Sequence, residues 1–538
     1  MRLLLLVLSL TVSLEVFAVV DMKNANFTDN WVDYKQKSKG FNLDLERTYN
    51  SRTLHNGILG FGWCTSLETK LQTYATGNIK VQVCGAGQET FFYPKGFKKA
   101  DLNKIVQTIF KAHKKAGNGL NKKQEKQFLA DLQADPKMRA NLAEQYRLNF
   151  KIKKGQVLVA DTRGLDSLKF DGKQYIRTRA DNIKEFYDIK GRLVRLLDTN
   201  KNTLTYSYRG NKLVQIKDRS GLQINFKYGS NDKISQITGP KGLKVTYRYK
   251  GSDLVFVENA WGNKYSYTYD DLHNLTKITY PDKTTREVKY DKNKDWVIGF
   301  KDRKNCTEDY KYDFNKKDPK NHYWTTLVKK CGKKVTNRSR FEFWFKTRKP
   351  SGKYLARVKT VVNSKVTDIS YHPKFNRPIK ELRNGVETKI SYYKNGLIKT
   401  RKVGNKTSTF KYENRFKKVS QVKSGKTLTR FKYDDRGNLS FASNNRGQKV
   451  SLRYDRTGRI VKLIDQAKKV VDIKYDDTIG RPSRVERPGL GVLKIKYKSN
   501  GDIQKVDSSS GPAVAVQVAS TFNSLLEIVR PAGVELGI

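Results

Sequence analysis

The sequence predicts a mostly β protein whose main part is a spiralling antiparallel sheet of repeated β hairpins. Three observations predict this fold: a tyrosine that recurs every 20 to 22 residues, a turn motif after many of these tyrosines, and short strands in which apolar and polar residues alternate. Strict alternation places successive side chains on opposite faces of a sheet. The repeats therefore predict one aromatic face and one polar face.

The recurring tyrosines define the extent of the repeat region. The series runs from Tyr187 to Tyr312, is interrupted by an irregular segment with an aromatic strand at 341–345, and resumes at Tyr371. Because a single hairpin is only marginally stable, we expect neighbouring repeats to stack and bury a shared face. The tyrosines are Tyr187, Tyr208, Tyr228, Tyr249, Tyr269, Tyr290, Tyr312, Tyr371, Tyr392, Tyr412, Tyr433, Tyr454, Tyr475 and Tyr497.

A turn motif, Tyr-Asp-x-x-Gly, opens the clearest repeats. The Asp side chain bonds backbone amides of a tight turn, and Gly accepts the positive φ that such a turn requires. The motif residues are Tyr187, Asp188 and Gly191; Tyr433, Asp434 and Gly437; and Tyr454, Asp455 and Gly458. Where Gly is missing, we expect Asn or Asp in the left-handed position. These substitutes are Asn211, Asp232, Asp253, Asn274 and Asn376.

The extended motif Tyr-Asp-x-x-Gly-x-Leu resembles the YD repeat of the Rhs family, which includes bacterial Rhs proteins, Tc-toxin shell proteins and animal teneurins. Residues 40–51 (GFNLDLERTYNS) and 57–63 (GILGFGW) look like the opening domain of bacterial Rhs proteins. The resemblance implies a sheet that spirals into a hollow shell around a C-terminal polypeptide, usually a toxin. We find no Asp-Pro-x-Gly self-cleavage motif and no toxin-sized segment after Tyr497. An open, curved sheet is therefore an alternative to a closed shell.

Four segments are expected along the chain. Residues 1–18 are mostly apolar after Arg2, with one acidic residue, Glu15, and predict a secretory signal peptide, with a single membrane anchor as the alternative. Residues 19–186 form the Rhs-type β domain, 187–510 the repeat sheet, and 511–538 a strand and a capping helix. No transmembrane span is expected after signal cleavage.

A helical insert is expected at residues 101–150 of the N-terminal domain. Helical spacing of apolar residues begins at Leu102, Asn121 with Gln124 fits a capping box, and Asp135-Pro136 fits the start of another helix. The favoured role is a structural insert, and partner binding is the alternative.

Four cysteines, Cys64, Cys84, Cys306 and Cys331, are candidates for disulfides because an exported chain meets oxidising conditions. Proximity along the chain favours Cys64–Cys84 and Cys306–Cys331, although three pairings are possible. No Cys-x-x-Cys motif occurs and the five His residues are scattered, so we expect no metal site and no cofactor.

The formal net charge of +56, from 108 Lys and Arg against 52 Asp and Glu, predicts adhesion to polyanions. Part of this charge is periodic, because the residue before many repeat tyrosines is basic. This candidate polyanion-binding stripe contains Lys227, Arg248, Lys289, Lys311, Lys411, Lys432, Arg453, Lys474 and Lys496. Solubility of a long sheet is the alternative explanation. In an exported protein, acidic glycan or lipopolysaccharide is a more plausible partner than cytoplasmic nucleic acid.

No catalytic residues are predicted. The sequence has no Gly-x-Ser-x-Gly, P-loop or His-Glu-x-x-His motif, and the paired acids Asp434-Asp435 and Asp476-Asp477 fall in turns. A glycan hydrolase is therefore the least favoured function. The favoured function is a non-enzymatic scaffold, periplasmic, on the cell surface or secreted, that displays, protects or delivers another polypeptide. The alternative is a basic envelope protein that binds acidic glycan.

Overall fold

The computed structural model describes residues 19–508 except 37, 39, 85–88, 149, 151, 349–351, 477–479 and 498–502, and also describes residue 511. The predicted signal peptide at 1–18 lies outside the described residues. The strand and capping helix predicted within 511–538 also lie outside them.

One long antiparallel sheet dominates the chain, and each of its strands pairs with the next strand in chain order. It begins at β7 in the N-terminal part and runs without a break into the repeats, so no sheet boundary separates residues 19–186 from 187–510. The strands of its first half are β7 (Lys70–Thr73), β8 (Ile79–Gln82), β9 (Glu89–Pro94), β10 (Val157–Ala160), β11 (Ser167–Phe170), β12 (Tyr175–Thr178), β13 (Lys184–Tyr187), β14 (Leu193–Leu197), β15 (Thr203–Arg209), β16 (Lys212–Asp218), β17 (Gln223–Tyr228), β18 (Ile234–Thr238), β19 (Lys244–Lys250), β20 (Asp253–Glu258), β21 (Lys264–Tyr269), β22 (Leu275–Thr279), β23 (Thr285–Tyr290), β24 (Val297–Lys301) and β25 (Thr307–Phe314).

The second half contains the long strands of the irregular segment and the second series of repeats. A single isolated bridge, Lys70 to Arg192, ties β7 to the turn before β14. Among the described residues no ladder joins the last strand, β42, to β7, so the sheet is curved and open and the predicted fold class is confirmed. These strands are β26 (His322–Cys331), β27 (Lys334–Arg348), β28 (Gly352–Val362), β29 (Lys365–Tyr371), β30 (Pro378–Arg383), β31 (Val386–Tyr392), β32 (Ile398–Val403), β33 (Lys406–Tyr412), β34 (Val419–Ser424), β35 (Thr427–Tyr433), β36 (Leu439–Asn444), β37 (Lys449–Tyr454), β38 (Ile460–Asp465), β39 (Val470–Tyr475), β40 (Pro482–Arg487), β41 (Gly491–Tyr497) and β42 (Ile503–Ser508).

The repeat tyrosine ties each hairpin to the one before it. The Tyr208 hydroxyl donates to the Leu193 carbonyl at 3.0 Å, and Leu193 is the ladder partner of Tyr187, the preceding repeat tyrosine. The register shifts at this step because Val214 of β16 is an extra residue opposite Ser207 and Tyr208, and strand alternation places the Tyr208 ring on the apolar face with Leu204 and Tyr206. The same hydroxyl-to-carbonyl bond is made by Tyr228, Tyr249, Tyr269, Tyr290, Tyr312, Tyr392, Tyr433, Tyr454, Tyr475 and Tyr497.

The Asp and Gly of the motif form the expected turn. Asp188 Oδ1 accepts from the backbone amides of Lys190 at 3.0 Å and Arg192 at 2.9 Å, while Gly191 has φ +78°. Asp434 and Asp455 bond their turns in the same way. Gly437 and Gly458 also have positive φ, at +78° and +90°.

The substitutes for the motif glycine were predicted correctly at only two positions. Asp232 and Asn376 have positive φ, but Asn211, Asp253 and Asn274 are not among the residues that do. In the first hairpin, Arg209 pairs with Lys212, so the loop is two residues long and Gly210 takes positive φ before Asn211. Loop length therefore decides which residue takes this conformation.

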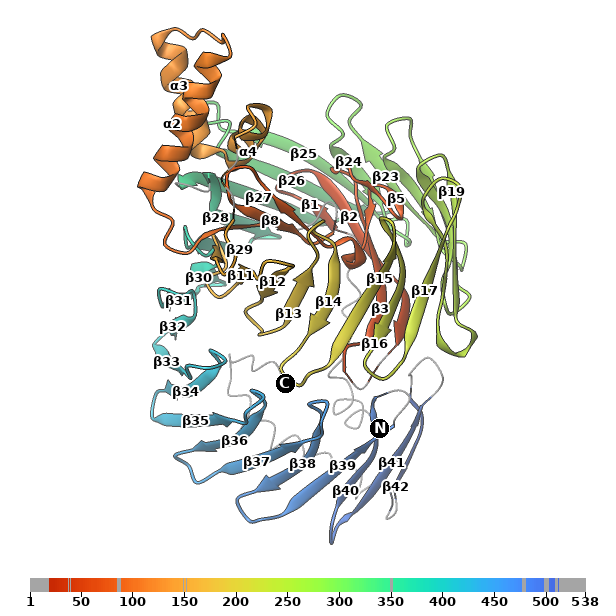
Figure 1. Cartoon of the computed structure of the whole chain (residues 1–538). Coiled ribbons are helices and arrows are strands. Elements are labelled where there is room, and N and C mark those ends of the chain that lie inside the picture. Colours follow the sequence, from red (N-terminus) through yellow and green to blue (C-terminus); the bar gives the residue numbers. More distant parts are fainter. Residues whose placement is uncertain are drawn as a thin grey trace.

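The helical insert lies between β9 and β10 and contains α2 (Lys99–Lys115), α3 (Lys122–Ala134) and α4 (Pro136–Gln145). Asn121 and Gln124 form the expected capping box, and Asp135 caps α4 with Pro136 as its first residue. The three helices share a small apolar core of their own. Figure 1 shows them projecting from one rim of the sheet. No helix among the described residues is long and apolar enough to cross a membrane.

The large sheet coils, so that its last strands return beneath its first ones. In Figure 1 the blue strands β36 to β40 lie below the yellow strands β13 to β16. Three side-chain contacts join the two levels across a seam: Asn182 Nδ2 donates to the Phe416 carbonyl at 3.0 Å, Asn202 Nδ2 donates to the Thr457 carbonyl at 2.9 Å, and the amides of Asn200 and Asn438 bond reciprocally.

A second, smaller sheet lies inside the curve. It contains β1 (Val19–Asp21), β2 (Asn26–Gln36), β3 (Leu43–Asn50) and β6 (Trp63–Cys64), in that order, and β4 (Asn56–Gly57) pairs with β5 (Gly60–Phe61) beside it. A 3-10 turn, η1 (Ser66–Glu68), leads from β6 into the large sheet, and η2 (Pro240–Gly242) precedes β19. In Figure 1 the red strands β2 and β3 are enclosed by the strands of the large sheet.

We predict that Tyr454→Phe locally destabilises the repeats by about 1 kcal/mol, because it removes a 2.8 Å hydrogen bond to the Leu439 carbonyl and keeps the ring. Hydrogen exchange of the β36–β38 amides measures the change. Tyr74→Phe is the control, because the Tyr74 hydroxyl only contacts Gln72, at 3.4 Å. Equal exchange in Tyr454→Phe and the wild type would contradict the role of this bond.

Candidate functional site

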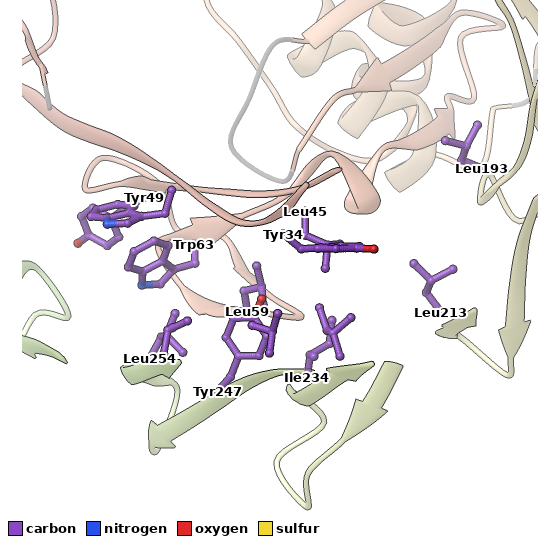
Figure 2. Close-up of a cluster of buried hydrophobic side chains, with 14 of the residues drawn as sticks. Tyr34, Leu45, Tyr49, Leu59, Trp63, Leu193, Leu213, Ile234, Tyr247 and Leu254 are labelled. Atoms are coloured by element: carbon purple, nitrogen blue, oxygen red, sulfur yellow. The ribbon is translucent and has the colours of Figure 1, made fainter. Parts of the chain in front are cut away.

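The concave face of the large sheet is an apolar surface that holds the small N-terminal sheet. Figure 2 shows Leu45, Leu59 and Trp63 of the N-terminal part facing Ile234 and Leu254 of the large sheet. Their side chains belong to one continuous core, and none is more than 3% exposed. The repeat sheet thus binds polypeptide on its inner face, with the alternating apolar residues of each strand as the contact surface.

A buried ion pair lies within this interface. Arg47 Nε of β3 bonds Asp33 Oδ2 of β2 at 2.7 Å, and both side chains are almost fully buried. The large sheet completes the cluster, because the Tyr247 hydroxyl donates to Asp33 Oδ2 at 2.9 Å and Arg47 Nη2 donates to the Tyr267 hydroxyl at 2.7 Å. Burial opposes the charge on Arg47, but Asp33 and the tyrosines raise its pKa above the ordinary value.

Three aromatic rings enclose the Arg47 guanidinium. Its carbon lies 5.0 Å from the ring centre of Trp31, 4.6 Å from that of Trp63 and 5.2 Å from that of Tyr267. Cation–π contacts of this kind strengthen when water is excluded. The cluster therefore combines charge, hydrogen bonds and ring contacts from both sheets.

Main-chain hydrogen bonds also join the two sheets. The Ile234 amide donates to the Ile58 carbonyl at 2.9 Å, and the Val297 amide donates to the Ala25 carbonyl at 3.1 Å. The Tyr49 hydroxyl accepts from the Leu275 amide at 2.9 Å. The inner face therefore supplies backbone donors as well as apolar contact.

A second charged contact joins the sheets near the edge of the interface. Arg286 Nη1 of β23 bonds Asp29 Oδ2 of β2 at 2.9 Å, and the Asp29 side chain is 4% exposed. Burial raises the pKa of Asp29 to about 6, because the nearby Arg286 only partly offsets the loss of water.

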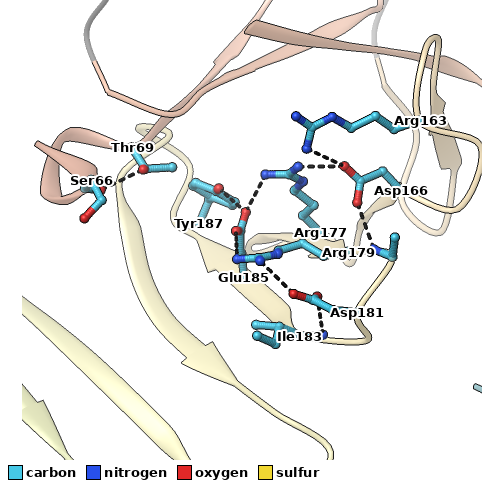
Figure 3. A network of polar contacts seen from close by, with 11 residues as sticks. Ser66, Thr69, Arg163, Asp166, Arg177, Arg179, Asp181, Ile183, Glu185 and Tyr187 are labelled. Carbon is cyan, nitrogen blue, oxygen red and sulfur yellow. Dashed lines mark hydrogen bonds and ion pairs between the residues drawn. The ribbon is translucent and has the colours of Figure 1, made fainter. Parts of the chain in front are cut away.

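Tyr187, the first repeat tyrosine, has a different partner from the others. Its hydroxyl donates to Glu185 Oε2 at 2.5 Å, and that oxygen also accepts from Arg177 Nη1 at 2.9 Å. Figure 3 shows Arg177 between Glu185 and Asp166, which it bonds at 2.7 Å. This network replaces the tyrosine-to-carbonyl bond where no repeat precedes.

The outward face of the sheet carries the candidate polyanion-binding stripe. All nine stripe residues are exposed. Each lies on a different strand, and the irregular segment divides them into a group of four and a group of five. Lys227, Arg248, Lys289 and Lys311 lie on β17–β25, and Lys411, Lys432, Arg453, Lys474 and Lys496 lie on β33–β41.

The four cysteines form two disulfides. Cys64 pairs with Cys84, with Cα atoms 5.4 Å apart, and Cys306 pairs with Cys331, with Cα atoms 4.3 Å apart. Cys64–Cys84 links β6 of the small sheet to the segment after β8, and Cys306–Cys331 closes the β25–β26 hairpin. No group of three or more His, Cys, Asp or Glu in the described part of the chain has the geometry to hold a metal ion.

Two family models match the chain. One, described as the RHS Repeat, matches residues 258–285, and the other, a domain of unknown function, matches residues 18–92. The first match falls on the strands in which the tyrosine-to-carbonyl bond recurs. This part of the chain is therefore similar to the RHS repeat. No curated protein matches it.

Solved structures similar to this chain include Tc-toxin assemblies. A Tc holotoxin pore from Photorhabdus luminescens is 10% identical, with a TM-score of 0.41, and the match covers 86% of this chain and 30% of that one. A TcdB2–TccC3 complex without its hypervariable C-terminal region is also 10% identical, with a TM-score of 0.38, covering 92% and 30%. This chain therefore spans less than a third of the length of those chains.

The inward-facing charges of the chain were not predicted as site residues. Arg47 follows Leu43 and Leu45 at a spacing of two, which places it on the buried side of β3. Asp29 and Asp33 similarly share the buried phase of β2 with Trp31. A charged residue at an inward-facing strand position was therefore the sequence feature from which this cluster could have been predicted.

We predict that Arg47→Met destabilises the protein by about 3–5 kcal/mol, because it leaves Asp33 buried without its charge partner. Thermal and denaturant unfolding measure the loss. The double variant Asp33→Leu/Arg47→Met should recover part of it, since both buried charges are then removed. Arg52→Met, at an exposed arginine that bonds the Lys294 carbonyl, is the control. A double variant no more stable than Arg47→Met would contradict the pairing.

We predict that Asp29→Asn stabilises the protein relative to the wild type at pH 7.5, by up to about 3 kcal/mol. The folded protein holds the Asp29 proton up to about pH 6, whereas the unfolded chain loses it near the ordinary pKa of 3.8. The stability that Asp29 contributes therefore falls as pH rises between these values. The difference in unfolding free energy between variant and wild type, followed from pH 4 to pH 8, should grow across this window. A difference that stays flat from pH 4 to pH 8 would contradict the prediction.

Proposed function

We propose that this chain is an exported, non-enzymatic scaffold whose coiled sheet displays, protects or delivers another polypeptide. One observation carries the proposal: the concave face already holds a folded polypeptide segment, the N-terminal sheet, by apolar contact, main-chain bonds and a buried ion pair. A surface with these properties suits a second polypeptide of similar chemistry.

The inner face continues beyond the region that holds the N-terminal sheet. A second apolar cluster lies on β33–β39. Its residues occupy the same inward-facing strand positions as the residues that contact the N-terminal sheet, and they include Phe410, Phe431, Leu452 and Ile473. The seam at Asn200 and Asn438 holds the two levels of the coil together. Together these features describe a curved wall with an apolar lining, which is the architecture that a protective scaffold needs.

The cysteines support export. All four are disulfide-bonded, and disulfides persist in oxidising compartments. The apolar segment at residues 3–14 is consistent with the same destination.

Site-specific photo-crosslinking tests the scaffold function. The full chain is expressed in a bacterial host together with the proteins encoded beside it, with p-benzoylphenylalanine at the inner positions Tyr412 or Tyr433. The matched outer positions are Thr407 and Thr409 of β33. We predict that a second polypeptide crosslinks at the inner positions alone, because only that face offers apolar contact. The second polypeptide should also resist digestion by trypsin until this chain is unfolded.

Crosslinks of equal yield at inner and outer positions would contradict enclosure of a partner. Crosslinks confined to this chain at both inner positions would contradict the delivery or protection of another polypeptide.

A further inference from the structure

The outward face of β32–β38 carries basic side chains and no acidic ones. In an antiparallel sheet, ladder partners project to the same face. Lys411 pairs with Gln421, which pairs with Arg430, and Arg453 pairs with Lys462. We name this surface the basic face, and its charged residues are Lys402, Lys411, Lys423, Arg430, Lys432, Lys449, Arg453 and Lys462.

Most charges of the basic face have no acidic partner within the described residues. One ion pair occurs, between Lys462 and Asp472 of the next strand at 3.0 Å, and Lys432 lies 5.9 Å from the ring centre of Phe441. The nearby acids Asp434 and Asp455 lie in turns, where they bond the backbone amides of their own loops. The basic face is therefore a continuous positive surface.

Part of the first half of the sheet differs, although its stripe is equally basic in sequence. On β20–β25, acidic residues share the outward face: Glu258 lies 4.0 Å from Lys264, and Glu287 lies 3.9 Å from Lys301. The ladder row of Lys289 passes through Gly299 to Asp309. The stripe predicted from the sequence is thus uniform along the chain, whereas acidic side chains share its face on β20–β25 and not on β32–β38.

We propose that the basic face binds a linear acidic polysaccharide outside the cytoplasm. Adjacent strands lie about 4.8 Å apart, and each stripe residue is offset by two residues along its strand from the ladder row of the one before, because the Lys411 row reaches Arg430 and the Lys432 row reaches Ser451. Lys411, Lys432 and Arg453 therefore recur about every 12 Å along a line oblique to the strands. An extended polyanion that follows this line presents acidic groups to successive stripe residues. The two disulfides support a location where such polymers occur.

The composition of the basic face favours a polysaccharide over single-stranded nucleic acid. Proteins that grip single strands combine basic residues with aromatic platforms for the bases. Phe441 is the only aromatic side chain in these ladder rows, and Lys432 covers it. The remaining neutral positions include Thr400, Thr409, Gln421 and Ser451, which suit hydrogen bonds to hydroxyl groups.

Binding of the full chain to heparin and to polygalacturonate, between about 50 and 300 mM NaCl, tests the proposal. The variant is K411Q/K432Q/R453Q. The matched control is K264Q/K289Q/K311Q, which removes the same charge from exposed outward positions of β21, β23 and β25, where acidic residues share the outward face.

We expect the wild type and the control to bind both polymers alike. The variant should bind about tenfold more weakly and lose about 2 from the slope of log K against log salt, because three ionic contacts are lost. Equal weakening in variant and control would overturn the proposal, since net charge alone would then explain binding. Tighter binding of single-stranded DNA or of phosphatidylglycerol vesicles than of either polysaccharide would overturn the polysaccharide assignment.

Discussion

The hydrogen bond from most repeat tyrosines to a backbone carbonyl of the preceding hairpin is the contact on which the rest of this structure depends. Strand alternation places the tyrosine ring inward and the preceding Lys or Arg outward. Because this alternation recurs along the repeats, the sheet acquires one apolar face and one polar face rich in basic residues. The two proposed functions use opposite faces of the same sheet.

The inner face derives its binding capacity from this regularity. Alternating Leu, Ile, Val and Tyr side chains form a wall on which the N-terminal sheet packs, and the Arg47 cluster lies at the centre of that contact. A buried ion pair adds little net stability but is costly to break, so it favours one way of docking over others. On this interpretation, Asp33 and Arg47 fix the orientation of the N-terminal sheet, while the apolar wall supplies most of the affinity.

Much of the fold could be predicted because it is encoded locally. Tyr-Asp-x-x-Gly specifies a turn within five residues, and helix caps such as Asn121 with Gln124 act within a single turn. The prediction was less accurate at turns such as Gly210-Asn211, where the pairing of the flanking strands decides the loop length. The continuous ladder from β7 into the repeats was also not foreseen, because the strands before Tyr187 lack the motif.

The sequence by itself determined the repeat, its two faces and the helical insert, because these depend on residues close together in the chain. Only the tertiary structure decided which distant residues meet. The curvature of the sheet brings Asn200 to Asn438 across the seam, and it brings Tyr247 and Tyr267 to the Asp33–Arg47 pair. Strand register likewise decided that acidic residues share the outward face on β20–β25 and not on β32–β38. The curvature of the sheet and the register of its strands depend on many strands together, so the sequence of a single repeat does not determine which distant residues meet.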